Sequence, residues 1–282
     1  MQVKVDIHSH IYERHHWADE TVAEIAAAYG NSDICHCPPI EHWQQVAQKV
    51  DRVAVFAMMM NATGLVVPNE YIHEYVKDHP KKLIGVASVD PNVPGCIEQL
   101  DHAVKTLGFQ ALKLSGAYQD FNPADTCYDP LYRKAQELDI PIFWHQSTTS
   151  LSRTPLRWSQ PLLLDEVAQR FPKLRQLICH IGHPWHTDAV MVIRKHRNVY
   201  ADMSGFGFRR LQFYQALVTA HEYGVAHKIF FGSDHPFATV DDSVQYLYDA
   251  SEMAAKANLP PISQEFIEGM LQRDSFKVMG MG

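Results

Sequence analysis

The sequence predicts a (β/α)8 barrel, the eight-stranded parallel barrel also called a TIM barrel. Short apolar, β-branched segments recur eight times along the 282 residues, and stretches with helical apolar spacing lie between them. Strands that alternate with helices are typical of parallel sheets covered by helices. An open doubly wound sheet is the alternative, but it favours a glycine-rich turn after the first strand, and "HSHIYERHH" contains no glycine. We therefore expect one α/β barrel domain over residues 1–282.

The individual elements follow in order along the chain. Strands are expected at 3–8, 51–60, 82–89, 109–115, 140–145, 174–180, 197–204 and 227–234. Helices are expected at 68–80, 94–108, 128–139, 159–172 and 188–196, and two closing helices at 243–257 and 263–279. The segment at about 11–50, between the first two strands, is a long insertion for a barrel. Its sequence leaves open whether it covers the site or forms a dimer contact.

Composition and charge narrow the class of protein. The chain is 46% hydrophobic and 20% charged, which is ordinary for a globular protein with a large core. The net charge of -7 and the lack of a lysine or arginine block argue against nucleic acid or a membrane as the main partner. The N-terminus lacks the apolar segment of a signal peptide. We expect a cytoplasmic protein with a small-molecule substrate, and a homodimer is left open.

The cysteines are few and scattered, which favours reduced thiols. The run "CHC" at Cys35, His36 and Cys37 contains side chains that can bind a metal. No second cluster in the sequence completes such a site, so a surface loop is the favoured interpretation.

Side chains at the expected carboxyl ends of the strands are the strongest functional signal. His8 and His10 end the first strand, and their spacing of two places both on one face. Later strands carry, at or near their ends, Lys113, His145, His180 and Asp234. In a (β/α)8 barrel these ends meet at the mouth where active sites lie. Imidazole and carboxylate groups together suit zinc, manganese or iron, so we predict a metal site there.

These motifs resemble the amidohydrolase superfamily, and within it the amidohydrolase-related branch (the amidohydrolase 2 family). That branch has D-x-H-x-H on strand 1, a histidine after strand 5, H-x-G-x-P-W after strand 6 and G-S-D-x-P after strand 8. The matching stretches here are "DIHSH", "FWHQS", "HIGHPW" and "FGSDHP", and "NVYADMSG" is similar to the branch's seventh strand. The resemblance runs from about residue 3 to 237 in the same motif order.

The resemblance implies a role for each strand-end residue. His8, His10 and His145 would bind one divalent metal, with Asp234 as the fourth ligand or as the proton-transfer carboxylate beside it. His180 would be the general acid or base. Zinc is expected first and manganese second.

Two further positions bear on the number of metals and on the loop after strand 6. Lys113 occupies the strand on which other branches carry a carbamylated lysine between two metals. Because this branch usually binds one ion, a binuclear site is less favoured, and Lys113 is expected to support the centre or face the substrate. His183 stands where the branch often has glycine, so a loop histidine is expected.

The same ligands serve two reactions. A divalent ion lowers the pKa of bound water and polarises a carbonyl oxygen. Asp234 would accept the proton from that water, and His180 would stabilise or protonate the oxygen. We therefore expect a metal-dependent hydrolase acting on a small carboxylate-bearing ester, lactone or amide. The alternative, found in the same branch, is non-oxidative decarboxylation of an aromatic or unsaturated carboxylic acid. A purely structural metal is least favoured, because structural zinc sites are usually closed and rich in cysteine.

Residues that face the substrate are sought in the loops after the strands. Arg153 and Arg209 are candidates to hold a carboxylate through a bidentate contact, although an exposed arginine is an equal interpretation for each. Trp185 is the stronger aromatic candidate for a flat pocket. Two further candidates are Tyr118 and Phe206. Trp144 precedes His145 and should face the opposite side of its strand, where it would pack between barrel and helix.

Overall fold

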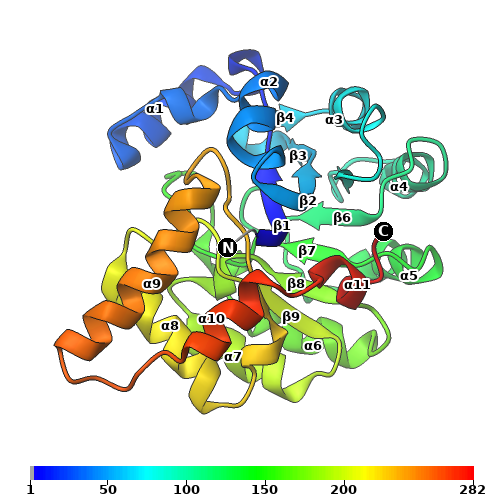
Figure 1. The fold of residues 1–282 in the computed structure, drawn as a ribbon. Coiled ribbons are helices and arrows are strands. Elements are labelled where there is room, and N and C mark those ends of the chain that lie inside the picture. The colour runs from blue at the N-terminus through cyan, green and yellow to red at the C-terminus, as the bar shows by residue number, and fades with distance from the viewer. Residues whose placement is uncertain (1–2) are drawn as a thin grey trace.

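The computed structural model describes residues 3–282 and contains eight parallel strands in a nearly closed barrel with helices between them (Figure 1). This confirms the predicted fold. Neighbouring strands follow the order β1-β2-β5-β6-β7-β8-β9-β10. Their bounds are β1 Val3–His10, β2 Val50–Phe56, β5 Leu83–Ser88, β6 Ala111–Leu114, β7 Ile142–Trp144, β8 Gln176–Ile178, β9 Val199–Asp202 and β10 Ile229–Phe230.

The last strand closes the barrel mainly through the residues that follow it. β10 itself is short, but the backbone beyond it continues alongside β1. The N–H of Asp234 donates to the carbonyl of His8 at 2.8 Å, and the N–H of His10 donates to the carbonyl of His235 at 2.9 Å. The carboxyl ends of the first and last strands are therefore fixed next to each other.

The strand expected at 51–60 is interrupted. It leaves the barrel after Phe56, and Met58–Met60 forms β3, which pairs antiparallel with β4 at Leu65–Val67. The turn between them needs a left-handed residue, which Gly64 supplies with φ 69°. Because residues 53–60 are all apolar, the sequence pattern alone does not show where the chain turns away.

Helices cover the outside of the barrel, and their bounds are α3 Asn69–Val76, α4 Cys96–Lys105, α5 Asp129–Glu137, α6 Leu163–Arg170, α7 His186–Lys195, α8 Arg210–Glu222 and α9 Val240–Lys256. The expected helices overlap with all of these except α8. Leu211 of α8 is exposed, so its apolar residues do not form one clear stripe. Among residues 3–282, none of the helices combines the length and apolar character needed to cross a bilayer.

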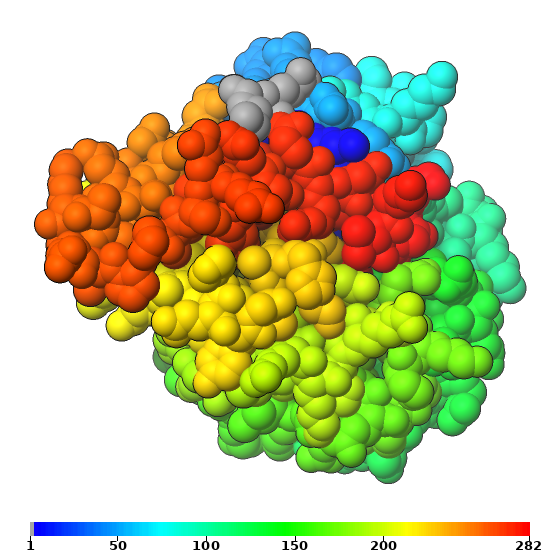
Figure 2. Space-filling model, turned by 60° about the horizontal axis from the view of Figure 1, so that its bottom comes forward, coloured from blue at the N-terminus to red at the C-terminus, as the bar shows by residue number. Residues whose placement is uncertain are grey.

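The helix expected at 263–279 is two helices, α10 Gln264–Leu271 and α11 Ser275–Met279. The second begins at Ser275 and is capped by Asp274, whose side chain accepts a hydrogen bond from the N–H of Lys277 at 3.1 Å. Figure 2 shows this C-terminal part, in red, beside the dark blue start of β1. Arg52 of β2 lies over the Phe276 ring at 4.8 Å, which joins α11 to the barrel.

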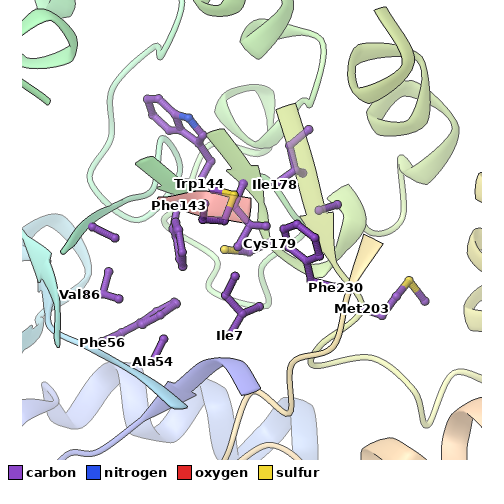
Figure 3. Close-up of a cluster of buried hydrophobic side chains, with 14 of the residues drawn as sticks. Ile7, Ala54, Phe56, Val86, Phe143, Trp144, Ile178, Cys179, Met203 and Phe230 are labelled. Atoms are coloured by element: carbon purple, nitrogen blue, oxygen red, sulfur yellow. The ribbon is translucent and has the colours of Figure 1, made fainter. Parts of the chain in front are cut away.

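The 11–50 segment contains α1 Asp19–Tyr29 and α2 Pro39–His42. Figure 1 shows both helices, with β3 and β4, at the end of the molecule toward which β1 points. Figure 3 shows buried side chains among the strands, including Ile7, Phe56 and Phe143. Trp144 packs outward against Tyr132 of α5, as expected from its position before His145.

Candidate metal centre and substrate cavity

The structure brings the predicted strand-end residues together at the mouth of the barrel. His8 Nε2 lies 3.3 Å from Asp234 Oδ1, and His10 Nε2 lies 3.2 Å from the same oxygen. Both histidines of β1 therefore face one carboxylate from the last strand end, as the spacing of two predicts.

The remaining two histidines complete the cluster. His145 directly follows β7, and its Nδ1 lies 3.3 Å from His180 Nε2. His180 Nδ1 lies 4.0 Å from Asp234 Oδ2. One ligand atom from each of His8, His180 and Asp234 lies within 4.8 Å of the others. The sequence predicts an acid or base role for His180, but its ring also lies close enough to His8 and Asp234 to bind the same metal ion.

Unusual backbone conformations aim these side chains. His180 and Asp234 have φ values of 56° and 61°, in the left-handed region that non-glycine residues seldom adopt. Gly205 has φ 77°, and a β-carbon there would collide with the Asp234 carboxylate and the His180 imidazole. Glycine at this position therefore allows the loop after β9 to approach the centre.

Asp202, at the end of β9, supports the centre and was not singled out from the sequence. Its Oδ1 accepts hydrogen bonds from the N–H groups of His180 and Ser204, and its Oδ2 accepts one from His8 Nδ1 at 3.0 Å. Burial raises the pKa of this carboxyl, but His8 and the hydrogen bonds it accepts hold it well below its usual range. The signal was present, because Asp202 is the last residue of its strand, as His10 is.

Contacts on the outer side of the imidazoles fix which nitrogen carries the proton. They are His8 Nδ1 to Asp202 Oδ2 at 3.0 Å, His180 Nδ1 to the Ser204 carbonyl at 3.1 Å, and His145 Nε2 to the Thr148 carbonyl at 3.4 Å. Carboxylate and carbonyl oxygens only accept, so these nitrogens are the protonated ones.

The inner nitrogens consequently point lone pairs at one another and at Asp234. His8 Nε2 is buried and has no hydrogen-bond partner within residues 3–282. His180 Nε2 and His145 Nδ1 face each other without a proton to share. A divalent cation satisfies such a set of lone pairs, and imidazole with carboxylate is a donor set that zinc and manganese accept. The residues present thus fit a metal.

The charge states agree with this arrangement. Burial lowers the pKa of His8 to about 3 and also lowers that of His10, so both rings are neutral near pH 7, as ligands must be. Burial raises the pKa of the Asp234 carboxyl, but the opposing effect of His180 and His8 is larger, so the pKa lies below its usual range. Its carboxylate is therefore ionised.

A cavity opens above this cluster. Its floor is polar, with His10, His145, His180 and Asp234, whereas its walls are largely aromatic and aliphatic. The wall residues are Tyr12, Trp17, Ile25, Tyr29, Met58, Leu65, Tyr118, Leu151, Phe206 and Phe237. Four of these, from Tyr12 to Tyr29, belong to the 11–50 segment, which therefore covers the site. The sequence named Tyr118 and Phe206 but missed the wall from this segment.

Lys113 lies under the floor of the cavity and is fully buried. Its Nζ is 3.0 Å from Cys179 Sγ and 4.8 Å from the centre of the Phe56 ring. It therefore contacts both the cavity and the packed interior of the barrel.

The three other residues expected to face the substrate lie in different places. Arg209 lines the cavity and is exposed at its rim, with its guanidinium over Phe208. Arg153 is not part of the cavity lining: it pairs with Glu20 at 2.7 Å and donates to the Thr63 carbonyl at 2.9 Å, which ties α1 to the barrel loops.

Trp185 is also outside the described lining. It is half-buried and precedes α7, so the aromatic wall comes from other loops. His183, expected as a loop histidine, is buried in the lining and stacks on Phe206 at 4.6 Å. The surface loop favoured for "CHC" is wrong for two of its residues: Cys35 and Cys37 are buried in the core, and only His36 is exposed.

The sequence matches one protein family, and the fold is similar to several solved structures. A family model described as amidohydrolase matches residues 5–273. No curated protein matches the sequence. Similar solved structures include 2,6-dihydroxybenzoate decarboxylase from Rhizobium, with 16% identity, 99% of each chain covered and a TM-score of 0.70.

Two further structures show the range of activities on this fold. A dihydroxybenzoic acid decarboxylase from Polaromonas, with bound manganese and the inhibitor 2-nitroresorcinol, shares 15% identity over 99% of this chain and 97% of that one, with a TM-score of 0.69. A probable 2-pyrone-4,6-dicarboxylic acid hydrolase from Acinetobacter baumannii, with citric acid bound, shares 15% identity over 100% of each chain, with a TM-score of 0.66. At these identities the likeness shows the fold. The family match over nearly the whole length, together with the four motifs, shows that this chain belongs to the amidohydrolase family of enzymes.

Proposed function

We propose that this chain is a divalent-metal-dependent enzyme that removes carbon dioxide, without oxidation, from a planar aromatic or unsaturated carboxylic acid. The observation that carries the proposal is the cavity itself, in which a buried polar floor lies under aromatic and aliphatic walls. The sequence favours hydrolysis over decarboxylation, although the same ligands serve both reactions. We reverse that order because the aromatic and aliphatic walls suit a flat ring.

The metal would be held by Asp234, by His8 and His10, whose Nε2 atoms lie within 3.3 Å of Asp234 Oδ1, and by His145, whose Nδ1 faces His180 Nε2 at 3.3 Å. When bound, a divalent ion would polarise the substrate oxygens and draw charge from the ring. Zinc and manganese both suit this donor set, and the related Polaromonas decarboxylase holds manganese. We propose a single ion in this centre, because Lys113 Nζ contacts Cys179 Sγ at 3.0 Å and is not placed as a bridge between two metals.

Asp234 and His180 are the groups that we assign to proton transfer. Loss of carbon dioxide leaves an electron pair on the ring carbon, and one proton must reach that carbon to complete the product. The Asp234 carboxylate can take a proton from a substrate hydroxyl and return it to the carbon. His180, whose Nδ1 lies 4.0 Å from Oδ2 of that carboxylate, would be the second acid or base of the site.

Arg209 is the cation that we assign to a substrate carboxylate at the rim. It is exposed beside the cavity, so a bound acid can displace water from it and accept two parallel hydrogen bonds. Phe206 and His183, which stack on each other and line the same cavity, offer a flat surface for the ring.

Hydrolysis of a carboxylate-bearing lactone, ester or amide is the second candidate. The observation in its favour is the ionised state of Asp234, which can accept a proton from an attacking water as well as from a hydroxyl. The related probable pyrone-dicarboxylate hydrolase has the same fold.

The test compares both reactions on the metal-loaded protein. Hydroxybenzoic acids are assayed for carbon dioxide release, and pyrone-carboxylate lactones for ring opening. Asp234→Asn should abolish turnover, by at least about a thousandfold, while retaining the fold. Asp120→Asn is the matched control, because Asp120 is exposed and also has a positive φ, of 50°, that asparagine tolerates. Ring opening without carbon dioxide release would replace the proposal by hydrolysis, and full activity of Asp234→Asn would overturn both.

A further inference from the structure

A second group of metal-compatible side chains lies beside the candidate metal centre. It consists of Cys37 and Glu41 from the 11–50 segment and His235 from the end of the barrel. One ligand atom from each lies within 4.8 Å of the other two. None of these three residues takes part in the proposed reaction, so the cluster needs an explanation of its own.

His235 is the most unusual member. Its side chain belongs to a residue that is only 3% exposed, and both of its ring nitrogens are buried without a hydrogen-bond partner within residues 3–282. Its backbone is held at both ends, by the Ser233 hydroxyl at 3.1 Å and by the N–H of His10 at 2.9 Å. A buried imidazole with no partner is unfavourable, because its polar atoms lose their hydrogen bonds to water and gain none in the protein. A ligand that binds at an imidazole nitrogen would remove part of this cost.

The two partners in the 11–50 segment are also free to bind a ligand. Cys37 is fully buried, its backbone pairs with Tyr12 in both directions, and its Sγ has only a weak contact to the His10 carbonyl at 3.6 Å. Glu41 is half-buried, and its carboxylate makes no hydrogen bond or ion pair to any residue of the described chain. The nearby His42 differs, because both of its ring nitrogens are bonded, to Ser9 and to Tyr75.

The chemistry of the three groups selects the ion. We propose that Cys37, Glu41 and His235 form a second metal site, selective for zinc, that fastens the 11–50 segment to the carboxyl end of the barrel. Thiolate, imidazole and carboxylate are all zinc ligands, whereas magnesium and manganese disfavour sulfur. Binding releases the Cys37 thiol proton to solvent. The two charges of the ion are then matched by one thiolate and one carboxylate, so the buried site is neutral overall.

The site has a consequence for the cavity. Cys37 is bonded to Tyr12, and Tyr12, Trp17 and Tyr29 form part of the cavity wall. Zinc would therefore hold the covering segment against the barrel. The inference goes beyond the proposed function, and its test needs no substrate.

The test uses cobalt(II) as a probe on the full chain after removal of metal with a chelator. Cobalt bound by a thiolate absorbs in the near ultraviolet through sulfur-to-metal charge transfer, whereas cobalt bound only by imidazole and carboxylate does not. We expect this band in the wild type, its loss on addition of zinc, and its absence in Cys37→Ser. Cys35→Ser is the matched control, because Cys35 is an equally buried thiol two residues away and outside the cluster.

Each outcome of the cobalt experiment either supports the proposed zinc site or overturns it. Absence of the band in the wild type would overturn the proposal without recourse to any variant. Persistence of the band in Cys37→Ser would also overturn it and would point to Cys179, the other thiol close to a histidine. If Cys37→Ser does not fold, Glu41→Gln keeps the proposal testable: we expect the band to remain and zinc affinity to fall by at least about tenfold. Unchanged zinc affinity in that variant would remove Glu41 and with it the proposed site.

Discussion

Replacement of Asp202 by asparagine tests how the metal centre is organised. The carboxylate serves two sets of donors at once: its Oδ1 accepts from the N–H groups of His180 at 2.9 Å and Ser204 at 3.0 Å, and its Oδ2 accepts from His8 Nδ1 at 3.0 Å. Asparagine has the same shape but only one acceptor oxygen, and its other group donates. It therefore cannot satisfy both sets.

The two orientations of the asparagine have different costs. If its NH₂ group faces the two backbone N–H groups, these lose their acceptor, at about 1–3 kcal/mol each. If its NH₂ group instead faces His8, the imidazole can move its proton from Nδ1 to Nε2 and keep one hydrogen bond. The second orientation is cheaper. It places a proton on the nitrogen that faces Asp234, where a metal needs a lone pair.

We therefore expect Asp202→Asn to lower the free energy of unfolding by about 1–3 kcal/mol and metal affinity by about 10–100-fold. Urea unfolding measures the first quantity, and competition with a chromophoric chelator measures the second. Asp6→Asn is the control: Asp6 is equally buried, but it accepts from Ser233 and from the backbone N–H of His8 and contacts no imidazole.

Burial raises the pKa of Asp6 to about 7, so asparagine resembles its protonated form, and the Asp6→Asn variant should keep its metal affinity. Equal metal affinity in the wild type and in Asp202→Asn would refute the assignment of the His8 tautomer to Asp202. Equal loss in both variants would refute it as well, because Asp6 touches only the backbone of His8.

Two further substitutions test separate features. Gly205→Ala should reduce metal affinity at least about tenfold, because the added β-carbon would collide with Asp234 and His180. Gly224→Ala is the control, because Gly224 also has a positive φ, of 71°, but has open space around it, so this variant should show only the left-handed strain of about 1–2 kcal/mol in urea unfolding. Similar metal affinities in both variants would contradict the steric argument. Burial raises the pKa of the Asp165 carboxyl, but its hydrogen bonds with Lys195 and His196 lower the pKa more, to below the ordinary value of 3.8. The ionised carboxylate therefore stabilises the fold above pH 3.8, and this stabilisation is lost as the pH falls below that value. Asp165→Asn should therefore reduce the free energy of unfolding by less than about 1 kcal/mol at pH 7. The difference in stability between the wild type and this variant should shrink below pH 3.8, and a difference that grows in acid would contradict the predicted direction of the pKa shift.

The strand-end residues could be predicted from sequence because the barrel itself brings them together. His8, His145 and Asp234 are far apart in the chain, yet each lies at or just beyond the end of a parallel strand. Parallel strands in a closed barrel end on one rim, so their positions depend on the alternation of strands and helices and very little on the loops.

Loop residues could not be placed in the same way. Arg153 lies in a suitable loop for a substrate contact, but Glu20 and the Thr63 carbonyl, distant in sequence, bind its guanidinium first. The sequence favours a surface loop for the "CHC" run because no second cluster completes a metal site, and a loop has no periodic pattern that would show burial. Its buried state follows from the backbone pairing of Cys37 with Tyr12, which no local signal reveals.

The alternation along β1 explains how the covering segment and the metal centre are coupled. His8 and His10 face Asp234, whereas Ser9 between them bonds the Ala54 carbonyl at 2.6 Å and His42 of α2 at 2.8 Å. One strand end therefore supplies ligands on one side and a fastening for the 11–50 segment on the other. Because that segment also forms part of the cavity wall, a change in it can alter which acid fits without moving a metal ligand. Substrate choice in this chain should accordingly be altered by substitutions in the covering segment, and metal binding by substitutions at the strand ends.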